Sequence, residues 1–258
     1  MEQYERRLYL INTLLAERGR SMPVPRDEAE QKRLLRALMN IRMPAPLSEE
    51  YLNIEGEYLK EEAKAKGIAA LSELAPCGDG LYLRQGDITR LACDAIVNAA
   101  NSGMTGCYQP LHNCIDNCIH SAAGLGLRNY CAELMRRQGY PEPTGEAKLT
   151  PAFNLPCKFV IHTVGPIVEG RLTELHVRQL ASCYKSCLWT ANENGLESIA
   201  FCCISTGVFG FPQREAARIA VSTVADYKAQ TGSRIKVIFN VFKDEDLMLY
   251  RELLSEGE

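Results

Sequence analysis

The chain has 258 residues, 46% of them hydrophobic, so it can bury a substantial core and most of it is expected to fold. Its 29 basic and 32 acidic residues give a net charge of -3, which argues against bulk electrostatic binding to nucleic acid but permits a local phosphate site. The chain has no run of about 18 apolar residues, and its N-terminus is charged from the second residue, so we expect a cytoplasmic protein with no membrane span and no signal peptide.

Residues 1–75 are predicted to form an N-terminal helical extension without catalytic residues. Apolar side chains recur at helical spacing in two segments, and prolines at positions 23, 25, 44 and 46 separate the helices. A third helix is predicted to begin after Ser48, because a serine followed by acidic residues is typical of a helix N-cap. The side chains expected to be buried are Leu8, Ile11, Leu14 and Leu15 in the first segment and Leu34, Leu35, Leu38 and Ile41 in the second.

Beyond residue 80, short apolar runs alternate with helical patterns. Strands separated by helices call for a mostly parallel sheet with both faces covered, and the ligand crevice of such a sheet lies beyond the carboxyl ends of its strands. The motifs GDIT, NAANS and STGVFGFP all lie where strand-like runs stop. The expected strands fall within residues 81–89, 94–101, 158–166, 198–206 and 236–242, and the expected helices within residues 114–138, 172–194, 212–231 and 244–254.

The eleven cysteines are an odd number and are spread through apolar runs, which does not suit a disulfide framework. Cys183 and Cys187 are four residues apart in a helical pattern, and Cys202 and Cys203 lie inside a strand-like run. A reduced thiol in such a place behaves as a small apolar side chain. We predict that these four thiols are packed in the core.

The segment STGVFGFP, residues 205–212, joins an expected strand to an expected helix. Glycines let backbone N–H groups approach an anion, and a helix N-terminus adds a favourable dipole, so the segment could cradle a diphosphate. The alternative is an ordinary glycine-rich turn.

Two further strand ends carry short polar side chains. Asn98 and Asn101 end the strand at 94–101, where amides can bind ribose hydroxyls, and the alternative is an Asx turn. Asp87 in GDIT could accept a hydrogen bond from an adenine amino group, and the alternative is a turn or a helix cap. Neither motif is specific when taken alone.

Together, the segments GDIT, DAIVNAAN, IDNCIHSAAG, VIHTVGP and STGVFGFP occur in the order and spacing found in macrodomains, and the chain resembles that family over about residues 80–254. The resemblance implies a three-layer α/β/α macrodomain with a mixed, mostly parallel sheet over residues 76–258. It also implies ADP-ribose as the ligand.

The resemblance assigns roles to individual residues of this chain. Asp87 and Ile88 would contact the adenine and Phe242 would flank it. Asn101 would bind the distal ribose, and Asp116 falls where hydrolytic macrodomains place an aspartate that helps activate the attacking water. Phe209 would pack beside the distal ribose. The diphosphate would be bound by Ser205, Thr206, Gly207, Val208, Phe209 and Gly210.

The loop before Asp116 departs from the usual pattern of hydrolytic macrodomains, which has consecutive glycines there. This chain reads SGMTGCYQPLHNCID and offers Cys107, His112 and Cys114 as metal ligands. Two thiolates and an imidazole suit Zn2+, and three protein ligands leave a fourth position for water or substrate. The loop resembles the zinc-containing macrodomains found with microbial protein ADP-ribosylation systems.

The alternative to this open site is a closed, structural zinc site completed by Cys118. The open site is favoured because Cys118 and His120 lie within a helix whose apolar positions should face the sheet. His120 and His162 are accordingly predicted to be packing histidines, and His176 to lie on the surface.

The function implied by the resemblance is zinc-dependent hydrolysis of the bond between C1'' of the distal ribose and a protein side chain. Asn101 would orient the ribose and Asp116 would act on the water, whether the zinc activates that water or coordinates the ribose. The expected partners are ADP-ribose and mono-ADP-ribosylated protein, and the expected state is a monomer. The alternatives are a non-catalytic ADP-ribose reader with a structural zinc, and a metabolic domain acting on free ADP-ribose derivatives.

Overall fold

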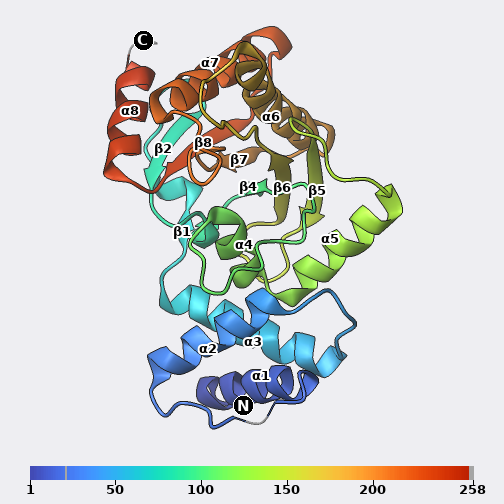
Figure 1. The fold of residues 1–258 in the computed structure, drawn as a ribbon. Helices are drawn as coiled ribbons and strands as arrows, with labels where there is room; N and C mark the ends of the chain where they lie inside the picture. Colours follow the sequence, from blue (N-terminus) through green and yellow to red (C-terminus); the bar gives the residue numbers. More distant parts are fainter. Residues whose placement is uncertain (21, 256–258) are drawn as a thin grey trace.

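The computed structural model describes residues 1–20 and 22–255. Short polar side chains fix the starts of two N-terminal helices: the Asp27 carboxylate accepts a hydrogen bond from the Glu30 N–H at 2.9 Å, and the Ser48 hydroxyl accepts one from the Tyr51 N–H at 3.1 Å. The helix start predicted after Ser48 is confirmed. The three helices of the extension are α1 (Gln3–Glu17), α2 (Glu28–Ile41) and α3 (Glu49–Ala65) (Figure 1).

These helices pack around an apolar core that is separate from the core of the sheet and to which Leu125, from the rest of the chain, also contributes. The buried faces of α1 and α2 are rotated slightly from those predicted. Leu8, Leu34 and Ile41 are only half-buried, whereas Leu10 and Met39 are buried in their stead. Because α1 packs against both α2 and α3, the covered face depends on packing angles that residue spacing does not give. The buried side chains of this core are Leu10, Ile11, Leu14, Leu15, Leu35, Leu38, Met39, Tyr51, Tyr58 and Leu125.

The rest of the chain is built on a six-stranded sheet of order β2-β8-β7-β4-β6-β5. Neighbouring strands are parallel except for β5, which runs antiparallel to β6, so the predicted mixed, mostly parallel sheet is confirmed. β5 lies outside the predicted strands because its sequence, AKLTP, has no apolar run. The strands are β2 (Leu81–Gln85), β4 (Ala95–Ala100), β5 (Ala147–Pro151), β6 (Phe159–Val164), β7 (Ser198–Phe201) and β8 (Lys236–Val241).

Helices cover both faces of this sheet, as predicted for a three-layer fold. Helices α6, α7 and α8 pack beside one another on one side, and α4 and α5 lie on the other side, toward the extension (Figure 1). No helix in the described part of the chain is long and apolar enough to cross a membrane. The helices are α4 (Ile115–Ala123), α5 (Leu125–Gln138), α6 (Glu174–Glu193), α7 (Gln213–Thr231) and α8 (Asp244–Ser255).

Short elements connect the extension to the sheet. A separate parallel pair is formed by β1 (Ala69–Ala70) and β3 (Leu91–Ala92), which also lies outside the predicted strands. The 3-10 helices are η1 (Leu71–Glu73) and η2 (Ile88–Arg90). The second of these matters for the site, because it begins directly after Asp87.

All eleven cysteines are free thiols. Cys183, Cys187 and Cys202 are buried as predicted, whereas Cys203 is half-buried. The strand expected to contain Cys202 and Cys203 ends at Phe201, so both thiols follow the strand instead of lying in it. Cys203 belongs to the turn into the loop, since its carbonyl accepts hydrogen bonds from the Thr206 hydroxyl at 3.0 Å and the Thr206 N–H at 3.5 Å.

The single helix expected within residues 114–138 is two helices, because the chain breaks at Gly124. Gly124 has a φ of 93°, which favours glycine, and a Cβ atom there would lie 2.5 Å from Oε2 of Glu55. The Leu125 N–H donates to both carboxylate oxygens of Glu55, at 3.2 and 3.1 Å. The extension thus supplies a carboxylate to the N-terminus of α5, where the helix dipole favours negative charge.

Glu55 is expected to make folding stability depend on pH. Burial raises the pKa of its carboxyl from 4.5 to about 7, against the opposing hydrogen bond from Leu125. Ionisation is therefore easier in the unfolded chain, and the free energy of unfolding falls as the pH rises from about 5 to about 8. We expect Glu55→Gln to remove about 2 to 3 kcal/mol of this fall. Denaturant unfolding of both proteins at the two pH values measures the difference, and parallel pH profiles would contradict the assignment.

Candidate active site

Four of the predicted site segments leave the sheet at one edge. Asp87 follows β2, Phe242 follows β8, residues 205–210 follow β7, and Asn101 follows β4. These strands are neighbours in that order and all run parallel, so their carboxyl ends form a continuous row. The crevice of a parallel α/β sheet lies at this edge.

The first end of the row carries Asp87, Ile88 and Phe242. Oδ1 of Asp87 accepts hydrogen bonds from the Thr89 N–H at 2.9 Å and the Thr89 hydroxyl at 2.7 Å, so Asp87 is the cap of η2 that the sequence allowed as an alternative. The Ile88 side chain is buried in the core, which leaves only its backbone to face a ligand. The Phe242 ring is 75% exposed, so one aromatic surface is open for stacking.

The middle of the row is the loop between β7 and α7. Ser205 and Gly210 have positive φ values of 64° and 67°, and they reverse the chain at either side of the loop. Within the described residues, the backbone N–H groups of Gly207, Val208 and Phe209 donate to no other group. Free N–H groups just before a helix N-terminus are suited to binding an anion.

The far end of the row pairs Asn101 with Asp116, a residue in the first turn of α4. The Asn101 Nδ2 group donates to Oδ2 of Asp116 at 3.0 Å and to the Gly106 carbonyl at 3.1 Å. Asn98, from inside β4, donates to Oδ1 of Asp116 at 2.9 Å. Both carboxylate oxygens are thereby oriented by amides.

Asp116 is 5% exposed, and burial raises the pKa of its carboxyl to about 6 despite the hydrogen bonds from Asn98 and Asn101, which lower it. A perturbed carboxyl at the carboxyl edge of the sheet is a candidate for acid–base chemistry. Burial also lowers the pKa of His120 well below its usual range, so this imidazole is neutral.

His120 is buried as predicted, but it also lies beside the site, a role that the sequence analysis does not assign to it. Its Nε2 atom is 3.6 Å from Oδ1 of Asp116, one helical turn away. The four-residue spacing from Asp116 was the pattern that could have revealed this contact. A Cβ atom on Gly106 would lie 2.8 Å from Cγ of His120, so the loop passes directly over the imidazole.

His162 is also buried as predicted, and it belongs to an internal hydrogen-bond network. Its Nδ1 lies 3.1 Å from the Asn98 amide and its Nε2 lies 2.9 Å from the Thr150 hydroxyl. His120, Cys131 and His162 bring potential ligand atoms within 4.8 Å of one another, but all three are buried. The network instead links β6 through Asn98 to Asp116. His176 is half-exposed at the start of α6.

Cys107, His112 and Cys114 come together in the loop before α4, with ligand atoms that all lie within 4.8 Å of one another. The Cys107 Sγ atom is 3.5 Å from Nδ1 of His112. Cys114 is the N-cap residue of α4, and its Sγ atom accepts a hydrogen bond from the Asn117 N–H at 3.4 Å. Cys118 is not a member of this group, because its Sγ atom faces Arg36 at 3.7 Å.

The loop that carries the cluster is fastened beside Asp116. The Asn117 side chain donates to the carbonyls of Cys107 and Gln109 at 3.3 and 3.0 Å, and Asn101 binds the carbonyl of Gly106. The structure therefore brings the three potential metal ligands, Asn101 and Asp116 to the same end of the row.

A family model for the macro domain matches residues 97–220. The chain is 56% identical over 261 residues to a protein of Treponema medium named protein-ADP-ribose hydrolase, covering 99% of this chain and 100% of that protein. It is 48% identical over 251 residues to a protein-ADP-ribose hydrolase of Staphylococcus aureus, covering 96% of this chain and 94% of that protein. A solved structure of a mutant of the Oceanobacillus iheyensis macrodomain with ADPR is 37% identical, with a TM-score of 0.64, and the match covers 71% of this chain and 97% of that one.

The fold and the site together define an α/β domain with a ligand crevice at the carboxyl edge of its sheet. The chain belongs to the macrodomain family. Both relatives that align with nearly all of it are named protein-ADP-ribose hydrolase, so the prediction that this protein is an enzyme of the hydrolase class is confirmed.

Proposed function

We propose that this chain is a zinc-containing hydrolase that removes mono-ADP-ribose from modified protein side chains. The observation that carries the proposal is the order of its polar segments, with Asp87 and Phe242 first, residues 205–210 next, and Asn101 last, beside Asp116. Adenosine, diphosphate and distal ribose follow one another in ADP-ribose in the same order. The relatives named protein-ADP-ribose hydrolase support the same substrate class.

Cys107, His112 and Cys114 fit zinc by their chemistry. Thiolates and imidazole are preferred zinc ligands, and the three donor atoms all lie within 4.8 Å of one another. A site with three protein ligands retains a position for water or substrate, which is typical of catalytic zinc. When bound, the zinc would supply a Lewis acid at the distal-ribose end of the site.

The chain's own residues would bind, orient and transfer a proton. The loop at 205–210 would bind the diphosphate through backbone N–H groups, and Asn101 would hold the distal ribose. Asp116 would take a proton from the attacking water as the water oxygen bonds to C1'' and the bond from C1'' to the protein side chain breaks. The same proton can then pass to the released side chain, so that the carboxylate is regenerated.

The proposal predicts about one zinc per chain and loss of hydrolysis when that zinc is removed. The test is to measure ADP-ribose released from a mono-ADP-ribosylated protein, before and after chelation and after zinc is added back, with elemental analysis of each sample. We expect release to stop on chelation and to return with zinc.

Three other outcomes would each contradict part of the proposal. Binding of the modified protein without any release would identify a reader. Full activity in samples free of zinc would show that the metal has no catalytic role. Turnover of free ADP-ribose derivatives alone would show that a modified protein is not the substrate.

A further inference from the structure

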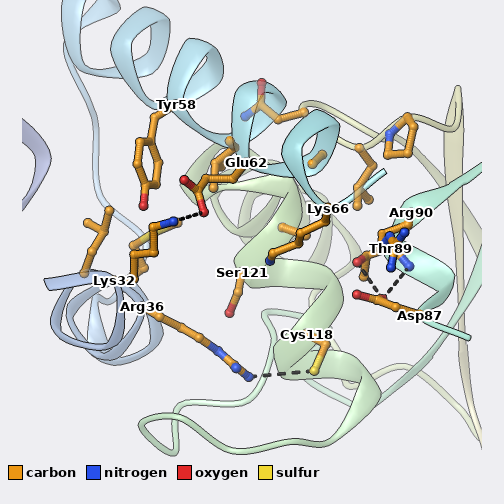
Figure 2. Close-up of a pocket in the computed structure, with 18 of the residues that line it drawn as sticks. Lys32, Arg36, Tyr58, Glu62, Lys66, Asp87, Thr89, Arg90, Cys118 and Ser121 are labelled. Carbon is orange, nitrogen blue, oxygen red and sulfur yellow. Dashed lines mark hydrogen bonds and ion pairs between the residues drawn. The ribbon is translucent and has the colours of Figure 1, made fainter. Parts of the chain in front are cut away.

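Helix α2 of the N-terminal extension reaches the loop that carries the proposed metal ligands. The Nη2 group of Arg36 donates a hydrogen bond of 2.7 Å to the backbone carbonyl of His112 and one of 3.0 Å to Oδ1 of Asn117. In Figure 2 the Arg36 side chain extends from its helix across to α4, where the same group meets Cys118. One guanidinium therefore contacts a ligand residue directly and a second residue that fastens the loop.

Asn40, one helical turn further along α2, holds the neighbouring residue. Its Oδ1 accepts a hydrogen bond from the Leu111 N–H at 3.0 Å, and its Nδ2 donates to the Ser121 hydroxyl at 2.9 Å. Leu111 has a φ of 58°, which is unfavourable for a residue with a branched side chain. Such a conformation persists only where surrounding contacts impose it, and the buried Asn40 amide supplies one directly before His112.

Polar groups of α2 make the contacts with the loop described above. A cavity of about 670 Å³ separates α2 and α3 from the macrodomain at this point, and Leu35, Arg36, Leu111, Cys118 and Ser121 are among its lining residues. Figure 2 shows that α2, α3, α4 and the segment containing Asp87 surround it. The hydrogen bonds of Arg36 and Asn40 therefore join α2 to the loop beside this cavity, in addition to the bonds that Asn101 and Asn117 make to the loop from the macrodomain side.

The C-terminal end of α2 is itself anchored to the macrodomain. The Arg128 guanidinium, from α5, donates hydrogen bonds of 2.8 Å to the carbonyls of Met39, Asn40 and Arg42. Arg128 is 3% exposed, so this attachment is shielded from water. Arg36 and Asn40 therefore project from a helix whose C-terminal end is attached to the macrodomain.

We infer that Arg36 and Asn40 are positioning residues that hold His112 in the orientation needed to bind zinc, so that the extension is a functional part of the metal site. The inference rests on the proposed function, since it concerns the same metal. Groups that orient metal ligands through hydrogen bonds contribute to metal affinity although they do not touch the metal.

The test compares zinc affinity in Arg36→Met, Arg36→Lys and Arg33→Met, measured on the full chain by competition with a chromophoric chelator. Arg33 lines the same cavity from the same helix and makes no side-chain hydrogen bond to any residue that the structure describes, so its variant is the matched control. We expect Arg36→Met to weaken zinc binding by about 10- to 100-fold and Arg33→Met to leave it unchanged. Arg36→Lys keeps the positive charge but loses the planar guanidinium with its several N–H donors, so we expect an intermediate loss of zinc affinity.

Two further measurements separate positioning from a general loss of structure. ADP-ribose affinity by calorimetry should be the same in all variants, and the visible absorption of bound cobalt should change only in the Arg36 variants. Equal zinc affinity in Arg36→Met and wild type would overturn the inference and leave the proposed function standing. Parallel losses of zinc and ADP-ribose affinity would overturn it as well, by showing that Arg36 supports the whole fold. A wild-type chain that binds no zinc would overturn the metal proposal together with the inference.

Discussion

Replacing Asp116 with asparagine is expected to lower the turnover of a mono-ADP-ribosylated protein by about 100- to 10,000-fold, with little change in ADP-ribose affinity. The amide keeps the size of the carboxylate but cannot take a proton from water. Asp116 lies at the Asn101 end of the row, where we propose that the distal ribose binds, so the proposed contacts to the adenosine and diphosphate would remain intact. An interaction needed mainly in the transition state affects turnover more than ground-state binding.

The measurement is single-turnover hydrolysis beside calorimetric ADP-ribose affinity. Asp226→Asn provides the control, because it makes the same chemical change at an exposed carboxylate on α7. Asn101→Ala should act in the same direction as Asp116→Asn, since it removes a hydrogen bond to Asp116 and the proposed ribose contact. If both variants lose rate and affinity in equal proportion, these residues are binding groups and the catalytic assignment fails.

Cys114→Ser is expected to abolish zinc binding and to lower hydrolysis by about 100- to 1,000-fold. A neutral hydroxyl is a much poorer zinc ligand than a thiolate. Serine is also a good N-cap residue, so the variant should retain the cap that Cys114 gives to α4. The loss should therefore come from the metal site, with α4 intact.

Cys118→Ser is the matched control for this variant. Cys118 lies one helical turn beyond Cys114, but its thiol faces Arg36 and is not part of the ligand group. We expect it to keep about one zinc per chain and nearly full activity. Elemental analysis measures the zinc content of both variants, and a hydrolysis assay measures their activity. Loss of zinc from Cys118→Ser alone would favour the closed, structural site, and full zinc content in Cys114→Ser would remove Cys114 from the ligand set.

Much of the fold followed from local patterns. The five predicted strands and the covered parallel sheet rest on apolar runs separated by helical spacing, and a buried parallel strand must be apolar on both faces. Strands that do not follow this rule were not predicted. β5 lies at the edge of the sheet and most of its side chains are half-exposed, and β1 and β3 have only two residues each. The break at Gly124 was missed for a different reason, because the carboxylate that binds the first N–H of the second helix comes from Glu55, a residue of another helix.

By itself, the sequence determined which residues stand at the ends of parallel strands, and therefore that Asp87, Asn101 and the loop at 205–210 share one edge of the sheet. It also placed two thiols and an imidazole within one short loop, where chain connectivity alone keeps them near one another. These features depend on neighbours along the chain or on the direction of a strand.

Only the tertiary structure decided what surrounds those residues. The burial that raises the pKa of Asp116, the neutral His120 beside it and the two amides that orient its carboxylate come from packing between β4, β6 and α4. The hydrogen bond from Arg36 to His112 joins residues 76 positions apart. Spacing along a helix or strand cannot encode such contacts, because they depend on how whole elements dock, and that docking is set by the shared burial of many apolar side chains at once.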